Sequence, residues 1–95
     1  MAREQLKNLT EPMYYILLAL TSKQHGYGIM QTIDTLTGGR VKVGAGTLYA
    51  LLARFEKENI ISQVSEDGRK KTYQITDKGF RLLNEEYQRL NQLVL

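Results

Sequence analysis

The stretch Ile61–Ile75, ISQVSEDGRKKTYQI, decides the fold class of this chain. Apolar and polar residues alternate on both sides of an Asp-Gly dipeptide, which is typical of a tight turn between two antiparallel strands. We therefore predict a β-hairpin here. Arg69, Lys70 and Lys71 follow just past its tip. Consecutive cations on a protruding ribbon favour an anionic, extended partner, although a solvated hairpin that resists aggregation also needs polar residues.

Three segments before the hairpin have the apolar spacing of amphipathic helices. The first starts at Thr10, a capping residue that precedes an acid and a proline. The second follows the sequence HGYG at 25–28 and ends at a pair of glycines. The third runs from about 47 to 58, and Asn59 can end it in the left-handed conformation. Between the second and third helices, residues 40–43 alternate and could form one short strand.

The order of these elements is helix, helix, short strand, helix, hairpin, helix. This is the arrangement of a winged helix-turn-helix domain, a mainly α fold with a small β-hairpin. In such domains the third helix enters the major groove of DNA, and the hairpin forms the wing. The glycines at 44–46 would let the backbone before that helix approach a phosphate closely, and the helix start offers unpaired N–H groups. We predict Leu48, Leu52 and Phe55 as its core-facing side chains.

Candidate DNA contacts follow from this arrangement. Lys42 lies just before the third helix, Thr47 stands at its start, and Arg54 lies further along it. Arg69, Lys70 and Lys71 on the wing would meet phosphates or the minor groove, although strand alternation sends the two lysines to opposite faces. Capping by Thr47 and a surface ion pair at Arg54 are the ordinary alternatives.

A fourth helix is predicted from Asp77, capped by Thr76. Its apolar residues recur at spacings of 3, 4, 3 and 4, namely Phe80, Leu83, Tyr87, Leu90 and Val94. Such a heptad stripe suits pairing with a second copy, although the helix could also fold back on its own domain. We therefore expect a winged domain at 1–76 and a dimerisation helix at 77–95. A two-fold dimer would read a pseudo-palindromic operator in double-stranded DNA.

Composition excludes several classes of protein. The 95 residues carry a net charge of +3 and include no cysteine and one histidine, His25. A disulfide framework and a thiolate metal site are excluded, and His25 has no second histidine to complete a metal site. We recognise no catalytic motif, no cofactor site, no signal peptide and no segment that could span a membrane. We expect a cytoplasmic protein without a cofactor that is not an enzyme.

Three stretches resemble the PadR-like transcriptional regulators, winged-helix repressors of bacteria and archaea. They are ILLALTSKQHGYGIM at 16–30, GTLYALLARFEKENI at 46–60 and RKKTYQITDKGFRLL at 69–83. Ala50 replaces a proline and Asn59 a glycine that the family often has. The single terminal helix is similar to the short subfamily.

The resemblance implies a homodimeric repressor that leaves its promoter when an effector binds. Tyr49 matches the tyrosine of the family's recognition helix, whose hydroxyl could reach a phosphate or a base edge. In short members a small apolar effector can enter between the terminal helices of the dimer. Phe80 and Tyr87 are then the candidate effector contacts, although packing would explain both side chains equally well.

Two further interpretations stay open at this level. A winged helix can serve as a protein–protein interaction module that does not bind DNA, with the last helix holding another chain. The clustering of Lys42, Thr47 and 69–71 on one predicted face favours DNA, because a protein-binding module would more often expose an apolar patch there. A DNA binder without any effector is the other possibility.

Overall fold

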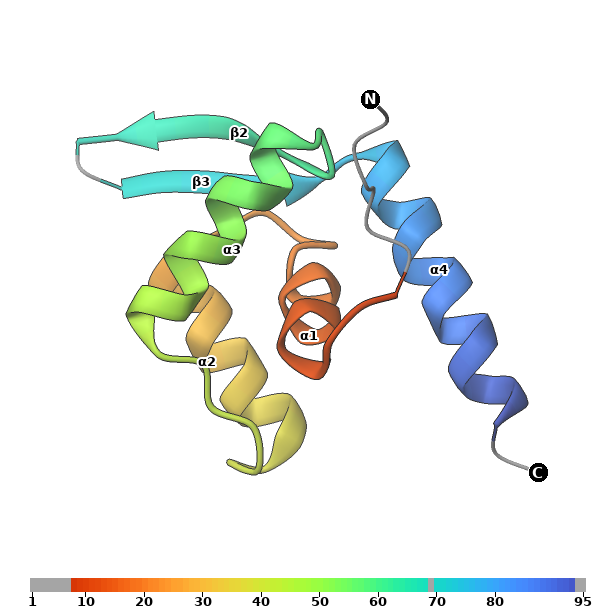
Figure 1. Ribbon diagram of the computed structural model, residues 1–95. Coiled ribbons are helices and arrows are strands. Elements are labelled where there is room, and N and C mark those ends of the chain that lie inside the picture. Colours follow the sequence, from red (N-terminus) through yellow and green to blue (C-terminus); the bar gives the residue numbers. More distant parts are fainter. Residues whose placement is uncertain (1–7, 69, 94–95) are drawn as a thin grey trace.

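The computed structural model describes residues 8–68 and 70–93 and confirms the predicted fold class (Figure 1). Four helices and three short strands follow one another along the chain. They are α1 (Glu11–Ala19), β1 (Gln24–His25), α2 (Gly26–Thr37), α3 (Ala45–Lys57), β2 (Ile61–Asp67), β3 (Lys70–Ile75) and α4 (Asp77–Gln92). Figure 1 shows the hairpin of β2 and β3 projecting beyond the helices, with α4 on the other side of α1 from α2.

Local chemistry sets most of the helix boundaries. Thr10 caps α1, because its hydroxyl accepts the N–H of Met13 at 3.3 Å. His25 caps α2 in the same way, with Nδ1 accepting the N–H of Gly28 at 3.3 Å. The left-handed residues Gly38 (φ 61°) and Asn59 (φ 63°) lie where α2 and α3 end, as predicted.

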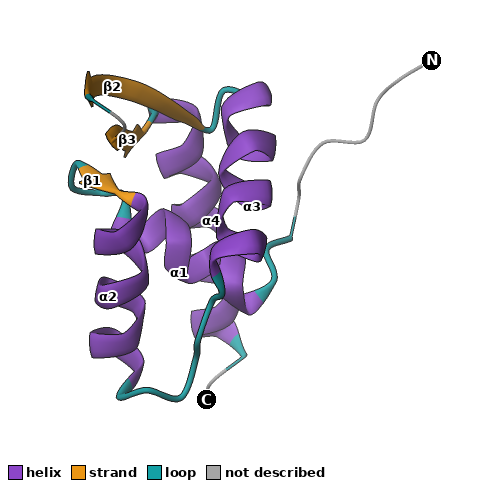
Figure 2. Ribbon diagram, turned by 90° about the vertical axis from the view of Figure 1, so that its left-hand side faces the viewer, coloured by secondary structure: helices purple, strands orange, loops and turns teal. Residues whose placement is uncertain are grey.

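The short strand lies at Gln24–His25 and not at 40–43, where we expected it. It pairs antiparallel with β3, so that the sheet has the order β1-β3-β2 and β1 leads directly into α2 (Figure 2). The alternation at 40–43 has another cause. Val41 and Val43 point into the core, but the backbone N–H of Val41 bonds to the hydroxyl of Thr37 and to no strand.

One core joins the helices to the base of the wing. Its ten largest fully buried side chains come from α1 and its C-cap, from α2 and α3, and from the start of β2 and the residue before it. They include the predicted residues of α3: Phe55, Ile16, Leu17, Leu20, Ile29, Ile33, Leu48, Leu52, Ile60 and Ile61. Burying a side chain of this size stabilises the fold by roughly 1.5–3 kcal/mol. The core therefore fixes α3 and the wing relative to each other.

The start of α4 is locked onto the end of α3. The hydroxyl of Thr76 accepts the N–H of Gly79 at 3.1 Å and lies 2.7 Å from the carbonyl oxygen of Asn59, to which it can donate. A Cβ atom on Gly79 would overlap the carbonyl oxygen of Ile60. Glycine is therefore required here for close packing of the helix against the backbone.

Further along α4, Leu83 is only 5% exposed and packs in the core. This differs from the expectation of one apolar stripe that faces a second copy. Leu83 packs inside its own domain, whereas other residues of the stripe lie on the surface. Glu86, 3% exposed, pairs with Arg89 at 2.6 Å. Hydrogen bonds from Arg89, and a weaker one from the backbone N–H of Leu9, lower the pKa of this carboxyl group. Leu83 and Glu86 thus hold α4 to its own domain.

Candidate nucleic-acid interface

The helix α3, predicted to read DNA, begins two residues earlier than expected. Its N-cap is Gly44, which provides no side-chain hydrogen bond to the first turn. Thr47 consequently lies inside the first turn, exposed, and its hydroxyl bonds to no described residue. A Cβ atom on Gly44 or Gly46 would meet nothing within 4 Å, so this end of the helix faces open space. Uncapped N–H groups at an open helix start can receive a phosphate.

Two of the predicted DNA contacts are already paired with acids on the surface. The ammonium group of Lys42 lies 2.9 Å from Asp34 of α2, and the guanidinium group of Arg54 lies 3.1 Å from Glu58. Both side chains of the Lys42–Asp34 pair are exposed, and such a pair contributes about 0–1 kcal/mol, so a phosphate could replace Asp34 at little cost. The Glu58 side chain is only 11% exposed, so Arg54 is held more firmly.

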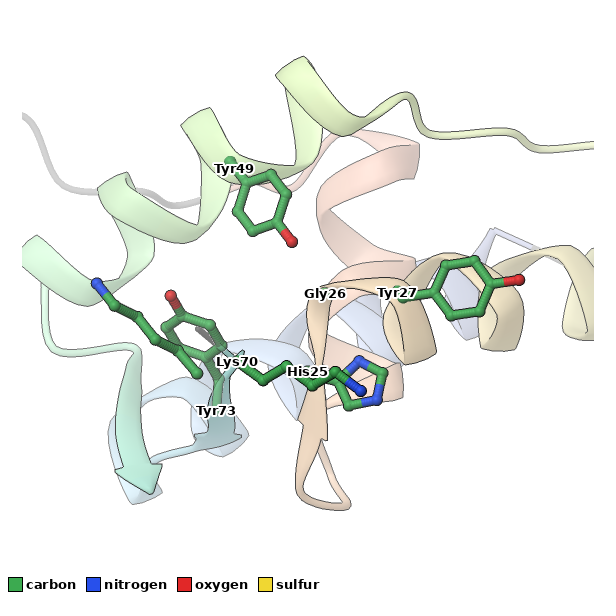
Figure 3. A pocket seen from close by; sticks show the side chains of 7 residues that line it. His25, Gly26, Tyr27, Tyr49, Lys70 and Tyr73 are labelled. Atoms are coloured by element: carbon green, nitrogen blue, oxygen red, sulfur yellow. The ribbon is translucent and has the colours of Figure 1, made fainter. Parts of the chain in front are cut away.

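Tyr49, Lys70 and Lys71 meet in a hollow between α3, the wing and the start of α2. We call this the wing hollow; its volume is about 550 Å³, and its lining residues are His25, Gly26, Tyr27, Tyr49, Lys70, Lys71 and Tyr73. In Figure 3 the ring of Tyr49 extends from α3 toward Gly26, and the ring of Tyr73 rises from β3 toward α3. Contrary to the expectation from strand alternation, both lysines border the same space.

Tyr73 forms a polar floor for the wing hollow. The residue is 6% exposed, and its hydroxyl makes no hydrogen bond with any described residue. Burial raises the pKa of Tyr73, and the nearby charge of Glu56 raises it further. The phenol therefore stays protonated at neutral pH and can donate a hydrogen bond to an anion that enters the hollow.

Tyr27 and Tyr73 also line the wing hollow, although the sequence pattern did not select either of them. Tyr27 lies in the HGYG segment that carried the family resemblance, so a signal was present in the sequence. Its ring is exposed beside the wing hollow, and its hydroxyl accepts a hydrogen bond from Gln31 at 3.3 Å. Nothing in the sequence marked Tyr73 as a site residue, because a tyrosine in a predicted strand is usually interpreted as part of the core. Arg69, also predicted, lies outside the described residues.

The opposite side of the molecule carries the predicted dimer and effector residues. Phe80, Tyr87 and Leu90 are exposed on α4, whereas Val94 lies outside the described residues. Phe80 and Tyr87 border a hollow of about 130 Å³ between α4 and α1, together with Tyr14, Leu18, Leu83 and Asn84. These are apolar walls without a charged group.

Residues 8–68 and 70–93 also bear on two other classes of site. No helix there combines the length and the apolar character that crossing a bilayer requires. No three histidine, aspartate or glutamate side chains in the same part of the chain come close enough together to hold a metal ion.

Comparison with known proteins connects this geometry to a family. A solved PadR-like transcriptional regulator from Bacillus cereus superposes with a TM-score of 0.71 at 27% identity, covering 84% of this chain and 81% of that one. The transcriptional regulator YqjI of Escherichia coli is 26% identical over 80 residues, which are 82% of this chain and 39% of YqjI.

An uncharacterized protein X of Lysinibacillus sphaericus is 36% identical over 72 residues, which are 72% of this chain and 66% of that protein. The chain thus spans just under two thirds of this relative and less of YqjI. The model of the transcriptional regulator PadR-like family matches residues 16–85, from the middle of α1 into α4. This chain belongs to the PadR-like family of transcriptional regulators.

Proposed function

We propose that this protein is a sequence-specific DNA-binding transcriptional regulator. One observation carries the proposal: the wing hollow brings Lys70, Lys71 and Tyr49 from the wing and α3 together beside the exposed start of α3. A groove bordered by ammonium groups and phenol hydroxyls suits the DNA backbone, because most protein–DNA hydrogen bonds go to phosphates. In this arrangement α3 lies in the major groove while the wing and the start of α2 follow the flanking strand.

The proposed contacts divide into two groups. Thr47, Lys42 and Arg54 lie on or just before α3 and outside the wing hollow, where they would meet base edges or the adjacent phosphates. Lys70 and Lys71 would hold the backbone and set the salt dependence of binding. Only the first group can contribute base-specific readout.

The regulator acts as a homodimer in this proposal, and α4 is its dimerisation helix. Phe80 and Tyr87 are 55% and 53% exposed, so α4 presents two large aromatic side chains to water. An exposed apolar patch of this kind supports an interface with another protein surface. Two-fold pairing through α4 would present two copies of α3 to a pseudo-palindromic operator. A small apolar effector entering beside Phe80 and Tyr87 would alter this pairing and release the operator. In this proposal the protein is a cytoplasmic repressor and not an enzyme.

The decisive experiment is fluorescence anisotropy of the purified chain on a labelled duplex from its own upstream region, compared with a scrambled duplex. We expect a preference of roughly a thousandfold for the upstream duplex and a steep fall of affinity with salt. Equal and weak binding to both duplexes would contradict sequence-specific recognition. Absence of binding even at low salt would favour a protein–protein module held through the apolar face of α4.

A further inference from the structure

Gly26, the first residue of α2, lies directly beneath the recognition-helix tyrosine. A Cβ atom on Gly26 would overlap the hydroxyl oxygen of Tyr49 and come within 2.8 Å of its Cζ atom. The backbone of Gly26 is not among the left-handed positions of the described chain. The missing side chain at position 26 therefore provides space for the observed orientation of Tyr49, and no special backbone conformation is involved. Gly26, in the sequence HGYG at 25–28, thus leaves room for Tyr49, in the sequence GTLY at 46–49.

We propose that Gly26 is a positioning residue for DNA binding, because it lets the phenol of Tyr49 lie across the start of α2 with its hydroxyl at the wing hollow. This inference rests on the proposed function. Figure 3 shows the hydroxyl of Tyr49 directed toward Gly26 and not away from the domain. A methyl group at position 26 would force the ring to rotate outward, and the hydroxyl would leave the hollow.

The position of this hydroxyl matters because the ring is otherwise weakly held. Tyr49 is 52% exposed, and its hydroxyl bonds to no described residue. A tyrosine this exposed would ordinarily sample several rotamers. Binding to DNA would restrict the side chain to one of them, at a cost in conformational entropy. Contact with the Cα of Gly26 removes part of that cost beforehand. The hydroxyl is then free to donate to a phosphate oxygen that Lys70 or Lys71 also contacts.

A double-mutant cycle in DNA affinity tests the proposal. Tyr49→Phe removes only the hydroxyl, and we expect about tenfold weaker operator binding, the loss typical of one hydrogen bond to a charged group. Gly26→Ala should cost a similar factor by displacing the same hydroxyl. Because both changes remove one contact, the double variant should also lose about tenfold. Independent losses that multiply to about a hundredfold would overturn the inference, as would full affinity in Gly26→Ala.

Gly28→Ala is the matched control. It makes the same replacement two residues later in α2, but its Cβ atom would meet the side-chain amide of Gln24, which lies outside the wing hollow, and not Tyr49. We expect operator affinity within about twofold of wild type. If Gly26→Ala does not fold, Gly26→Ala/Tyr49→Ala should restore folding and bind DNA as Tyr49→Ala does. A double variant that stays unfolded would assign Gly26 a purely structural role.

A ¹⁹F NMR signal from 3-fluorotyrosine at position 49 separates this inference from the proposed function. In the free protein, Gly26→Ala should shift that signal and Gly28→Ala should not. An unshifted signal would overturn the steric contact whether or not DNA binds. A shifted signal in a chain whose wild type binds no duplex would instead refute the proposed function and, with it, the role of Gly26 in DNA binding.

Discussion

Two faces of the molecule each expose an aromatic side chain to the same extent, but the side chains that surround it differ in charge and polarity. Tyr49 on α3 and Tyr87 on α4 are 52% and 53% exposed. Tyr49 is surrounded by lysines, a histidine and further tyrosines, whereas Tyr87 borders a hollow whose other lining side chains carry no charge. Exposure of an aromatic ring alone therefore does not distinguish these two faces, and the neighbouring groups decide which chemistry a partner would need.

The helix α4 shows the same division within one element. Gly79, Leu83 and Glu86 are its buried residues, while Phe80 and Tyr87 remain on an exposed flank. The 3-4 apolar spacing in the sequence includes the buried Leu83 as well as the exposed Phe80 and Tyr87, because adjacent positions of a helix stripe differ by only a fraction of a turn. Substitutions on the buried side of α4 should therefore affect folding, and those on its exposed side should affect dimerisation. Substitutions on the wing should affect DNA binding.

Leu83→Glu should have the largest effect, and it acts on the fold. The side chain is 5% exposed, so the variant must bury a charge or pull α4 away from the core. We expect the free energy of unfolding to fall by about 4 kcal/mol, most of what a domain of this size possesses. Urea denaturation followed by circular dichroism measures it. A folded but monomeric Leu83→Glu would instead place this side chain in the dimer interface.

Phe80→Glu/Tyr87→Glu should separate subunits without unfolding them. Both side chains are exposed, so the charges remain in water in the monomer, but pairing through α4 would bury them. Losing the second half-site should weaken operator binding by about a hundredfold or more. Sedimentation equilibrium and anisotropy measure the two effects.

The matched control for that variant is Gln88→Glu/Gln92→Glu, which adds the same two negative charges at exposed polar positions of the same helix. We expect this control to remain dimeric. A dimer that survives Phe80→Glu/Tyr87→Glu would mean that the apolar flank of α4 is not the interface between subunits.

Much of the fold could be predicted because its signals are local. The cap at Thr76 and the left-handed turn at Asn59 depend on residues within one turn of the chain, and both are present. The strand β1 could not be predicted, since it has two residues and exists only because Tyr73 and Thr72 of β3 lie beside it. Strand pairing over such a distance leaves no periodicity in the sequence.

Three members of the candidate site could be predicted from the sequence, but their grouping could not. The sequence pattern selected Tyr49, Lys70 and Lys71 separately, and the fold brings them together around one hollow. Strand alternation argued against both lysines sharing a site. The contact between Gly26 and Tyr49 joins α2 to α3, which only the tertiary structure reveals.

On the wing, Lys70→Ala/Lys71→Ala should weaken operator binding and leave the fold intact. Both lysines are exposed, so we expect an unchanged melting temperature. Removing two phosphate contacts should lower affinity about tenfold near 0.1 M salt and flatten the slope of log K against log salt by about two. Anisotropy across a salt series measures both, and Lys23→Ala/Lys78→Ala controls for net charge. If the two double variants behave alike, the lysines act through overall charge and not through the wing.

The smallest expected effect is a gain of affinity. Asp34 holds the ammonium group of Lys42 at 2.9 Å, with side chains 55% and 75% exposed. Asp34→Asn frees that cation and removes a negative charge near the proposed DNA path, so binding should tighten by about two- to threefold at low salt. The gain should disappear at high salt, where the interaction is screened. Glu58→Gln removes the charge that pairs with Arg54, although the Glu58 side chain is only 11% exposed. Comparing the two variants by anisotropy, with a melting temperature for each, shows which cation reaches a phosphate. Unchanged affinity in Asp34→Asn would remove Lys42 from the interface and confine DNA contacts to α3 and the wing.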